Sequence, residues 1–432
     1  MSIMPLPASL WRETAMQSPA SQVLSGIKSA DVVIVGGGYT GLSAALRAIE
    51  KCLKPVVVEA KEVGFGASGR NGGVVSTKYR VSLSAMAKLH GVDIARRMNQ
   101  IGHDAMDCVE HYVDMFDIRA AAFAKTGNLR CAHNQHTLSV LTEEAKTISD
   151  TFGDTNLRRV IDAEECAYET GSRDFVGGVL NAHTGVIHPL NFARGLAQAV
   201  RNGGGEIFEQ SAVLSISQAP DGVEVVTRHG SVRAGRLILA TNGYSDLTSA
   251  TSGIRTAVVP FRSAMVATEP LPTSIFETLM PNARSYSETR RMMRWFRRID
   301  DRMLFGGRGA FGKSDSDSAS AALESAMKGM FPQLASKVVT HRWSGLVAMT
   351  MDSLPQIGLI SQRTAFSLGY NGAGVAMATL LGRHAVDLVT GDQPYLGPML
   401  RPRPEGIPFY FLREAGVRTV AGWYQFLDRI GR

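Results

Sequence analysis

Residues 31–41 read DVVIVGGGYTG, a short apolar run that ends on a turn rich in glycine. A helical pattern follows over residues 42–49, and a second apolar run, residues 56–58, ends on Glu59. The order of strand, tight turn, helix, strand and acid is that of a complete dinucleotide-binding unit. The sequence therefore predicts a nucleotide cofactor at this turn.

Each glycine of this turn has a physical function. Gly36 permits the tight turn, Gly38 lets the backbone approach a pyrophosphate, and Gly41 lets the helix pack closely on the sheet. The pyrophosphate lies at the helix N-terminus, where free N–H groups favour negative charge. Glu59 follows Gly36 by 23 residues, close to the spacing of about 20 for an acid that binds ribose hydroxyls. An acid at this point favours FAD or NAD over a cofactor with a 2′-phosphate.

The composition limits the classes of protein that the chain can form. Its 432 residues are too many for one compact core, so two domains are expected. The net charge of +7 suits an anionic cofactor and an acidic substrate, although a generic basic surface explains it equally well. No basic stripe on a known nucleic-acid module is present, so no nucleic-acid partner is expected.

Cysteines and apolar runs exclude further classes. The four cysteines are scattered without a CxxC pair, so neither a metal site nor a disulfide framework is expected. The longest apolar runs are shorter than the roughly 18 residues that cross a bilayer. Residues 1–24 do not have the pattern of a secretory signal, so we expect a cytoplasmic protein.

A second glycine-rich stretch follows the acid directly. Residues 63–73 read VGFGASGRNGG, which suits neither a helix nor a packed strand. Such a loop can wrap a phosphate or a flat ring with backbone N–H groups, with Arg70 close by. A flexible surface loop is the alternative.

The turn at residues 36–41, the acid Glu59 and the loop at residues 66–73 together resemble the FAD-dependent D-amino-acid-oxidase superfamily. Within it the chain is most similar to amine oxidases of the γ-glutamylputrescine oxidase and glycine/sarcosine oxidase type. The resemblance implies an α/β fold, with a discontinuous Rossmann-like FAD-binding domain and an antiparallel-sheet substrate domain. It also implies FAD as the cofactor.

Two later stretches match the same family. Residues 240–243 form a second turn on the dinucleotide side, and residues 369–375, GYNGAGV, open a helix whose N-terminus would point at the flavin. The residues assigned to the cofactor by the motifs and by the resemblance are Gly36, Gly38, Tyr39, Thr40, Gly41, Glu59, Ala60, Ser68, Arg70, Asn71, Gly72, Val213, Ala240, Gly243, Gly369, Gly372, Gly374 and Val375.

The patterns divide the chain into interleaved segments. Residues 1–27 are expected to form an N-terminal arm, and residues 396–432 a capping segment that lies on the body rather than on a membrane surface. The FAD-binding domain is expected to comprise residues 28–80, 172–254 and 341–395. The substrate domain is expected to comprise residues 81–171 and 255–340.

Arginines in the second domain are candidates for binding a substrate carboxylate. Arg262, Arg297 and Arg308 lie on predicted strands, and one of them would bind bidentately, with solvated surface arginines as the alternative. Tyr244 and Arg308 are the candidate catalytic residues, although a packed tyrosine is an equal alternative for Tyr244. His188 precedes Pro189 at a helix start, so a structural role is expected for it.

Three positions depart from the family pattern. Residues 346–349 read LVAM where glycine and D-amino-acid oxidases carry an arginine, so simple α-amino acids held in that way are not expected. No cysteine lies beyond Cys166, which excludes the covalent flavin link of sarcosine oxidases. Ala373 replaces the histidine of the γ-glutamylputrescine-type motif GYNGHG.

The resemblance implies oxidation of a carbon–nitrogen bond, in a secondary amine that bears a carboxylate. A hydride passes to the flavin, the imine hydrolyses to an aldehyde or oxo acid, and dioxygen is reduced to hydrogen peroxide. One alternative is a membrane-associated dehydrogenase of the D-amino-acid type that passes electrons to a quinone. The others are γ-glutamylputrescine oxidase itself and a flavoprotein with a purely structural FAD. The sequence does not indicate an oligomeric state.

Overall fold

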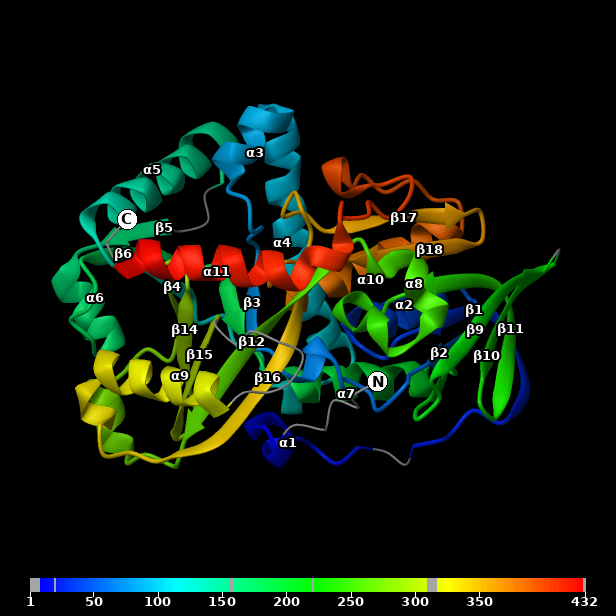
Figure 1. The fold of residues 1–432 in the computed structure, drawn as a ribbon, viewed down its shortest axis with the longest axis horizontal. Coiled ribbons are helices and arrows are strands. Elements are labelled where there is room, and N and C mark those ends of the chain that lie inside the picture. Colours follow the sequence, from blue (N-terminus) through cyan, green and yellow to red (C-terminus); the bar gives the residue numbers. More distant parts are fainter. Residues whose placement is uncertain (1–7, 19–20, 155–157, 220, 309–316, 430–432) are drawn as a thin grey trace.

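Two large β-sheets organise the molecule, a computed structural model that describes residues 8–18, 21–154, 158–219, 221–308 and 317–429 (Figure 1). The first sheet has the strand order β17-β18-β11-β1-β2-β8, and the second has the order β16-β12-β15-β14-β13-β4-β6-β5. This mixed α/β arrangement is the predicted fold class.

The first sheet is parallel at its centre. β1 (Gly26–Val35) pairs in parallel with β2 (Pro55–Val58) and β11 (Gly230–Leu239). The sheet continues through β8 (Glu206–Phe208) and β18 (Thr364–Leu368) and ends on the antiparallel β17 (Gln356–Ser361). β9 (Val213–Ala219) and β10 (Gly222–Thr227) form an antiparallel extension beside β11.

Both faces of the central strand are buried, which explains its unbroken apolar sequence. Val32 and Ile34 pack into one core with α2 (Tyr39–Glu50), α4 (Val92–Met115), α7 (Pro189–Asn202) and α10 (Gly374–Val389). Val33 and Val35 face a second core, which includes residues of β10 and of β18.

The second sheet is almost entirely antiparallel. Its strands are β16 (Val339–Met349), β12 (Val259–Thr268), β15 (Arg302–Arg308), β14 (Arg294–Ile299), β13 (Ser285–Glu288), β4 (Asn128–Ala132), β6 (Gly177–Asn181) and β5 (Arg158–Ile161). α9 (Asp317–Met330) packs Met327 and Met330 against Phe296 and Phe305 on one face of it.

The remaining elements connect or cover these layers. They are the small sheet of β3 (Val74–Ser76) and β7 (Thr184–Val186), and the helices α1 (Leu10–Thr14), α3 (Leu83–His90), α5 (Gln135–Phe152), α6 (Ala163–Thr170) and α8 (Ser252–Arg255). Among the described residues, no helix combines the length and the apolar character needed to cross a membrane.

Two strands lie outside the predicted domain boundaries. β6 and most of β16 were assigned to the FAD-binding domain, but both pair within the second sheet. α4, assigned to the substrate domain, packs on α10 and contributes to the core beside the first sheet. Strand pairing and helix docking are decided by distant partners, which the local pattern does not reveal.

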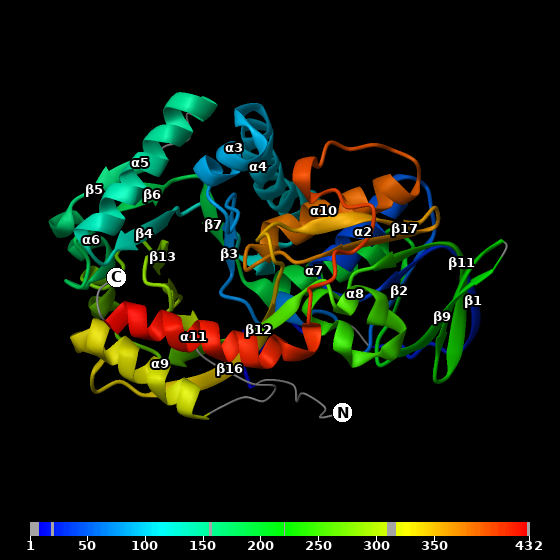
Figure 2. The ribbon, with the colours of Figure 1, turned by 45° about the horizontal axis from the view of Figure 1, so that its top comes forward.

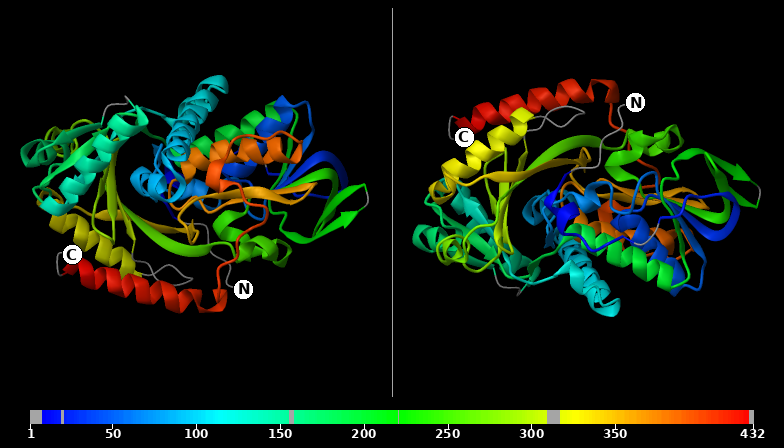
Figure 3. Two further views of the ribbon diagram at one scale, coloured as in Figure 1. Left: turned by 90° about the horizontal axis from the view of Figure 1, so that it is seen from above. Right: turned by 90° about the horizontal axis from the view of Figure 1, so that it is seen from below.

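The C-terminal helix α11 (Arg413–Arg429) runs along the side of the second sheet that carries α9 (Figures 2 and 3). The chain reaches it from the side of the first sheet, so the C-terminal segment extends from one half of the molecule to the other (Figure 3). A capping position on the body is therefore the arrangement found.

Candidate active site

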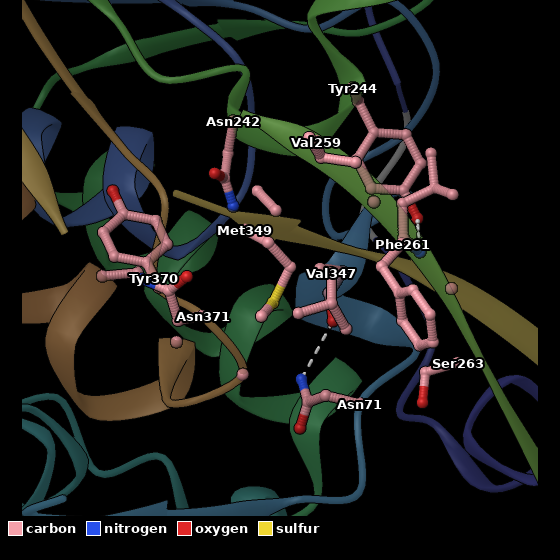
Figure 4. A pocket seen from close by; sticks show the side chains of 18 of the residues that line it. Asn71, Asn242, Tyr244, Val259, Phe261, Ser263, Val347, Met349, Tyr370 and Asn371 are labelled. Carbon is pink, nitrogen blue, oxygen red and sulfur yellow. Dashed lines mark hydrogen bonds between the residues drawn. The ribbon is translucent and has the colours of Figure 1, made fainter. Parts of the chain in front are cut away.

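One cavity of about 940 Å³ lies between the two sheets. This volume is near the upper end of the roughly 300–1,000 Å³ usual for ligand sites. Tyr244 and Tyr370 stand on opposite sides, and Val347 and Met349 lie between them (Figure 4). Both sheets and the C-terminal segment contribute to its wall.

The first glycine turn has the geometry that the motif predicts. Gly36 has φ +116°, and a Cβ placed on it would lie 2.8 Å from the carbonyl oxygen of Ala240. A Cβ on Gly41 would lie 1.9 Å from the carbonyl oxygen of Gly36, which fixes the close approach of α2 to the turn. Gly38 begins α2 without a side chain to cap it, so the positive end of the helix faces the cavity.

Glu59 lies at the end of β2 and lines the cavity. Its carboxylate oxygens accept hydrogen bonds from the backbone N–H of Gly37 at 2.6 Å and of Lys61 at 2.9 Å. Burial raises the pKa of Glu59, while the N–H donors oppose the rise. A half-buried carboxylate that lines the cavity can accept further donors such as ribose hydroxyls.

Three tryptophans fix the second glycine loop. The indole N–H of Trp11 donates to the carbonyl oxygen of Asn71 at 2.8 Å, and that of Trp343 donates to the carbonyl oxygen of Arg70 at 3.0 Å. A Cβ on Gly72 would lie 3.1 Å from the indole nitrogen of Trp295. The loop is therefore a rigid wall of the cavity, and the expected arm residue Trp11 is fully buried beneath it.

Arg70 braces the same loop from within. Its Nε–H donates to the carbonyl oxygen of Phe65 at 2.7 Å, and its guanidinium lies 4.6 Å from the centre of the Phe65 ring. Nη1 donates to the carbonyl oxygen of Ser344 at 3.3 Å, which links the loop to β16.

A second helix N-terminus opens on the cavity at α10. Gly372, with φ +95°, and Gly374 line the cavity, and α10 begins without a side-chain cap. The Asn371 side chain fixes this turn, because its amide donates to the carbonyl oxygen of Gly369 at 2.6 Å and its Oδ1 accepts from the backbone N–H of Thr350 at 2.9 Å. Two helix N-termini, a half-buried carboxylate and a long cavity together fit a dinucleotide with an anionic pyrophosphate.

Comparisons with known proteins identify the family. The model of the FAD dependent oxidoreductase family, DAO, matches residues 31–388. The chain belongs to this family of FAD-dependent oxidoreductases. The first glycine turn, the second loop and the N-terminus of α10 all lie within the matched residues.

Two curated relatives extend over almost the whole chain. A probable oxidoreductase OrdL of Haemophilus influenzae is 32% identical over 94% of this chain and 94% of its own. The gamma-glutamylputrescine oxidoreductase of Escherichia coli is 32% identical over 93% of each chain.

Solved structures share the fold of this FAD-dependent oxidoreductase. Glycine oxidase from Geobacillus kaustophilus superimposes with a TM-score of 0.75 at 18% identity, over 88% of this chain and 100% of its own. Iminodiacetate oxidase from Chelativorans superimposes with a TM-score of 0.69 at 16% identity, over 87% of this chain and 100% of its own.

Most of the residues assigned to FAD from the sequence line this cavity. They are Gly36, Gly38, Tyr39, Thr40, Glu59, Ala60, Ser68, Arg70, Asn71, Gly72, Val213, Ala240, Gly372, Gly374 and Val375. Gly41, Gly243 and Gly369 stand behind the wall. A Cβ on Gly369 would lie 2.3 Å from the Thr350 side chain, so this glycine serves packing beneath the site.

Two of the predicted substrate-binding arginines lie outside the cavity wall. Arg297 is buried and donates to the carbonyl oxygens of Gly73 at 3.1 Å and Ile187 at 2.9 Å, so it braces the second glycine loop. Burial lowers the pKa of Arg297. Arg262 is also buried, and its guanidinium contacts Ser344 Oγ. The side chain of Arg308 lies outside the described residues.

Tyr244 lines the cavity, and its place beside the cofactor stays a prediction. Its hydroxyl oxygen accepts a hydrogen bond from the backbone N–H of Leu346 at 3.2 Å, and its ring packs edge-on against Phe65. His188 caps α7 by accepting from the backbone N–H of Asn191 at 3.1 Å, which is the structural role predicted for it.

The sequence prediction missed the apolar chamber beside the second glycine loop. Its lining includes Phe261, Met265, Trp295, Val347 and Met349, drawn from three strands of the second sheet. Lys78 and Arg80, a few residues after the second loop, also line the cavity. Their closeness in sequence to that loop was the one available signal.

Proposed function

We propose that this FAD-dependent oxidoreductase is an oxidase of an amine that bears a carboxylate. When bound, FAD supplies the redox chemistry by accepting a hydride from the carbon next to nitrogen and returning the electrons to dioxygen as hydrogen peroxide. The relative that acts on gamma-glutamylputrescine and the structurally similar glycine oxidase support an amine as the substrate.

The apolar chamber beside the second glycine loop is the observation that carries the proposal. Val347 and Met349 belong to the segment in which glycine and D-amino-acid oxidases carry the arginine that binds a small amino acid, and Phe261 and Trp295 line the same chamber. Desolvation in such a chamber disfavours an ammonium and favours the neutral amine, which is the form that gives up a hydride. Among the described lining residues there is no histidine, and Glu59 is the one carboxylate, so the chain need not supply a general base.

Cationic side chains at the rim support a carboxylate on the substrate. Lys78 and Arg80 line the cavity with exposed side chains, on the segment that leaves the second glycine loop. Unlike Arg262 and Arg297, both side chains line the cavity, so we assign the substrate carboxylate to them. The proposed substrate therefore holds its anionic group away from the reacting carbon and nitrogen.

An anaerobic absorbance spectrum tests the function. The yellow holoprotein is mixed separately with sarcosine and with γ-glutamylputrescine, and bleaching by either identifies an amine-oxidising flavin and the substrate class. If the protein is yellow and neither compound bleaches it, both compounds are excluded as substrates. Oxygen consumption by the purified enzyme without membranes then separates an oxidase from a dehydrogenase that needs a quinone.

A further inference from the structure

The C-terminal segment contributes to the wall of the active-site cavity. The residues of this segment that line it are Ile407, Pro408, Phe409, Tyr410, Leu412, Arg413, Gly416, Val417 and Val420. The matched family region ends at residue 388, so this part of the wall lies beyond it. A cavity in the shared fold is thus completed by a segment outside the matched region.

The segment is anchored firmly at its start. The backbone N–H of Arg401 donates to the carbonyl oxygen of Ile357, and that of Ile407 to the carbonyl oxygen of Thr256, both at 2.8 Å. Phe409 follows with φ +52°, a left-handed conformation that a phenylalanine rarely adopts. The chain therefore turns sharply just after its last backbone anchor.

Beyond this turn the segment is held weakly. None of residues 409–420 is buried, and Phe409 and Phe411 expose 74% and 75% of their surface. Because few apolar side chains are buried over residues 409–420, lifting this part of the segment from the body costs a small free energy. Firm anchoring before Phe409 and weak packing after it are the features of a hinge.

We propose that residues 407–420 form a hinged wall of the active-site cavity, and that the inner face of α11 sets the size of amine that is admitted. Only the identity of the substrate rests on the function proposed above. The wall opens by bending at Pro408 and Phe409 and closes when α11 lies against the second sheet.

The inner face of α11 suits a long substrate. Within α11, Arg413, Gly416, Val417 and Val420 line the cavity, and their spacing of three or four residues places them on one side of the helix. Glycine at the middle position leaves the cavity open there, since a Cβ on Gly416 would meet nothing within 4 Å. A large side chain at this position would project into the opening without disturbing the fold.

Gly416→Trp tests the wall, with Gly422→Trp as its matched control. A Cβ on Gly422 also meets nothing within 4 Å, and Gly422 does not line the cavity. The first measurement is the acrylamide quenching constant of flavin fluorescence in the holoprotein without substrate. The second is kcat/KM for the amine that bleaches the flavin. Val420→Trp and Thr419→Trp repeat the comparison at the next turn, where only Val420 lines the cavity.

Gly416→Trp is expected to lower the quenching constant several-fold and kcat/KM by about tenfold, while Gly422→Trp matches the wild type. Equal quenching constants for the two members of both pairs would overturn the proposal. The quenching measurement needs no substrate, so it decides the role of the wall even if no tested amine reduces the flavin.

Discussion

Glu59 is the acid of the dinucleotide-binding motif, and its carboxylate lines the cavity where we expect the ribose of FAD. Its two carboxylate oxygens each accept one backbone N–H, from Gly37 and Lys61, while burial opposes its charge. The two N–H donors and the expected ribose hydroxyls bind the same carboxylate. Because the dielectric constant of the site is lower than that of water, each hydrogen bond to this negative charge is stronger than it would be in water.

Glu59→Gln is expected to weaken FAD binding. A glutamine presents an NH2 group where one carboxylate oxygen now accepts, which leaves a buried donor unsatisfied at about 1–3 kcal/mol. The dissociation constant of FAD should rise roughly 10- to 100-fold, measured by fluorescence titration of the apoprotein. Glu62→Gln is the control, because Glu62 pairs with Arg12 and lies outside the cavity wall. An unchanged constant in Glu59→Gln would contradict the ribose assignment.

Lys78 and Arg80 allow the carboxylate proposal to be tested at the residue scale. The double variant Lys78→Ala/Arg80→Ala should raise KM for a carboxylate-bearing amine by roughly five- to tenfold, with kcat almost unchanged, because rim charges contribute to binding more than to the transition state. The increase should shrink at high ionic strength. Lys28→Ala removes a charge that pairs with Glu206 elsewhere, and it should leave KM as it is. A fall in kcat at constant KM would assign the two residues to the reaction instead.

At the scale of single elements, sequence motifs predicted the structure best where the contacting segments are consecutive in the chain. The glycine turn, α2, β2 and Glu59 are consecutive, so their spacing alone defined the dinucleotide site. Arg297 was predicted to bind substrate because it lies on a predicted strand of the substrate domain. Its hydrogen-bond acceptors, the carbonyl oxygens of Gly73 and Ile187, lie more than a hundred residues away in the sequence. Contacts between such distant segments leave no periodic pattern to read.

The cap of α7 predicts a pH dependence of stability. Burial lowers the pKa of His188 to about 4, with Arg297 and Arg194 acting in the same direction. The folded state therefore keeps His188 neutral, whereas the unfolded chain takes up a proton below about pH 6.5. Stability from this residue is complete above that pH and is lost as the pH falls toward 4.

His188→Asn is expected to remove this dependence, because asparagine caps a helix equally well and does not titrate. Between pH 7.5 and pH 5 the wild type should lose on the order of 2 kcal/mol more stability than the variant. The melting temperatures of both proteins at the two pH values give the comparison. Parallel losses in the two proteins would show that His188 is not responsible.

At the scale of the whole molecule, the active-site cavity belongs to no single segment. Its wall takes the glycine turns from the first sheet, the apolar chamber from the second sheet and the residues 407–420 from the C-terminus. The glycine turns were predictable because each of them directly follows an apolar strand of the first sheet, namely β1, β11 or β18. The chamber and the C-terminal wall were not, since their apolar residues resemble ordinary core and surface positions in sequence.

The three tryptophans around the second glycine loop give the protein a built-in optical reporter. Trp11, Trp295 and Trp343 adjoin Arg70, Asn71 and Gly72, whereas the fourth tryptophan, Trp423, lies exposed on α11. Indole emission overlaps the near-ultraviolet absorption of flavins, so resonance energy transfer should dim the three inner indoles as FAD occupies the cavity. Titration of the Trp423→Phe apoprotein with FAD should extinguish most of its ultraviolet emission, and a signal that stays bright would place the flavin away from this loop. Cofactor loading could then be followed in real time without a label.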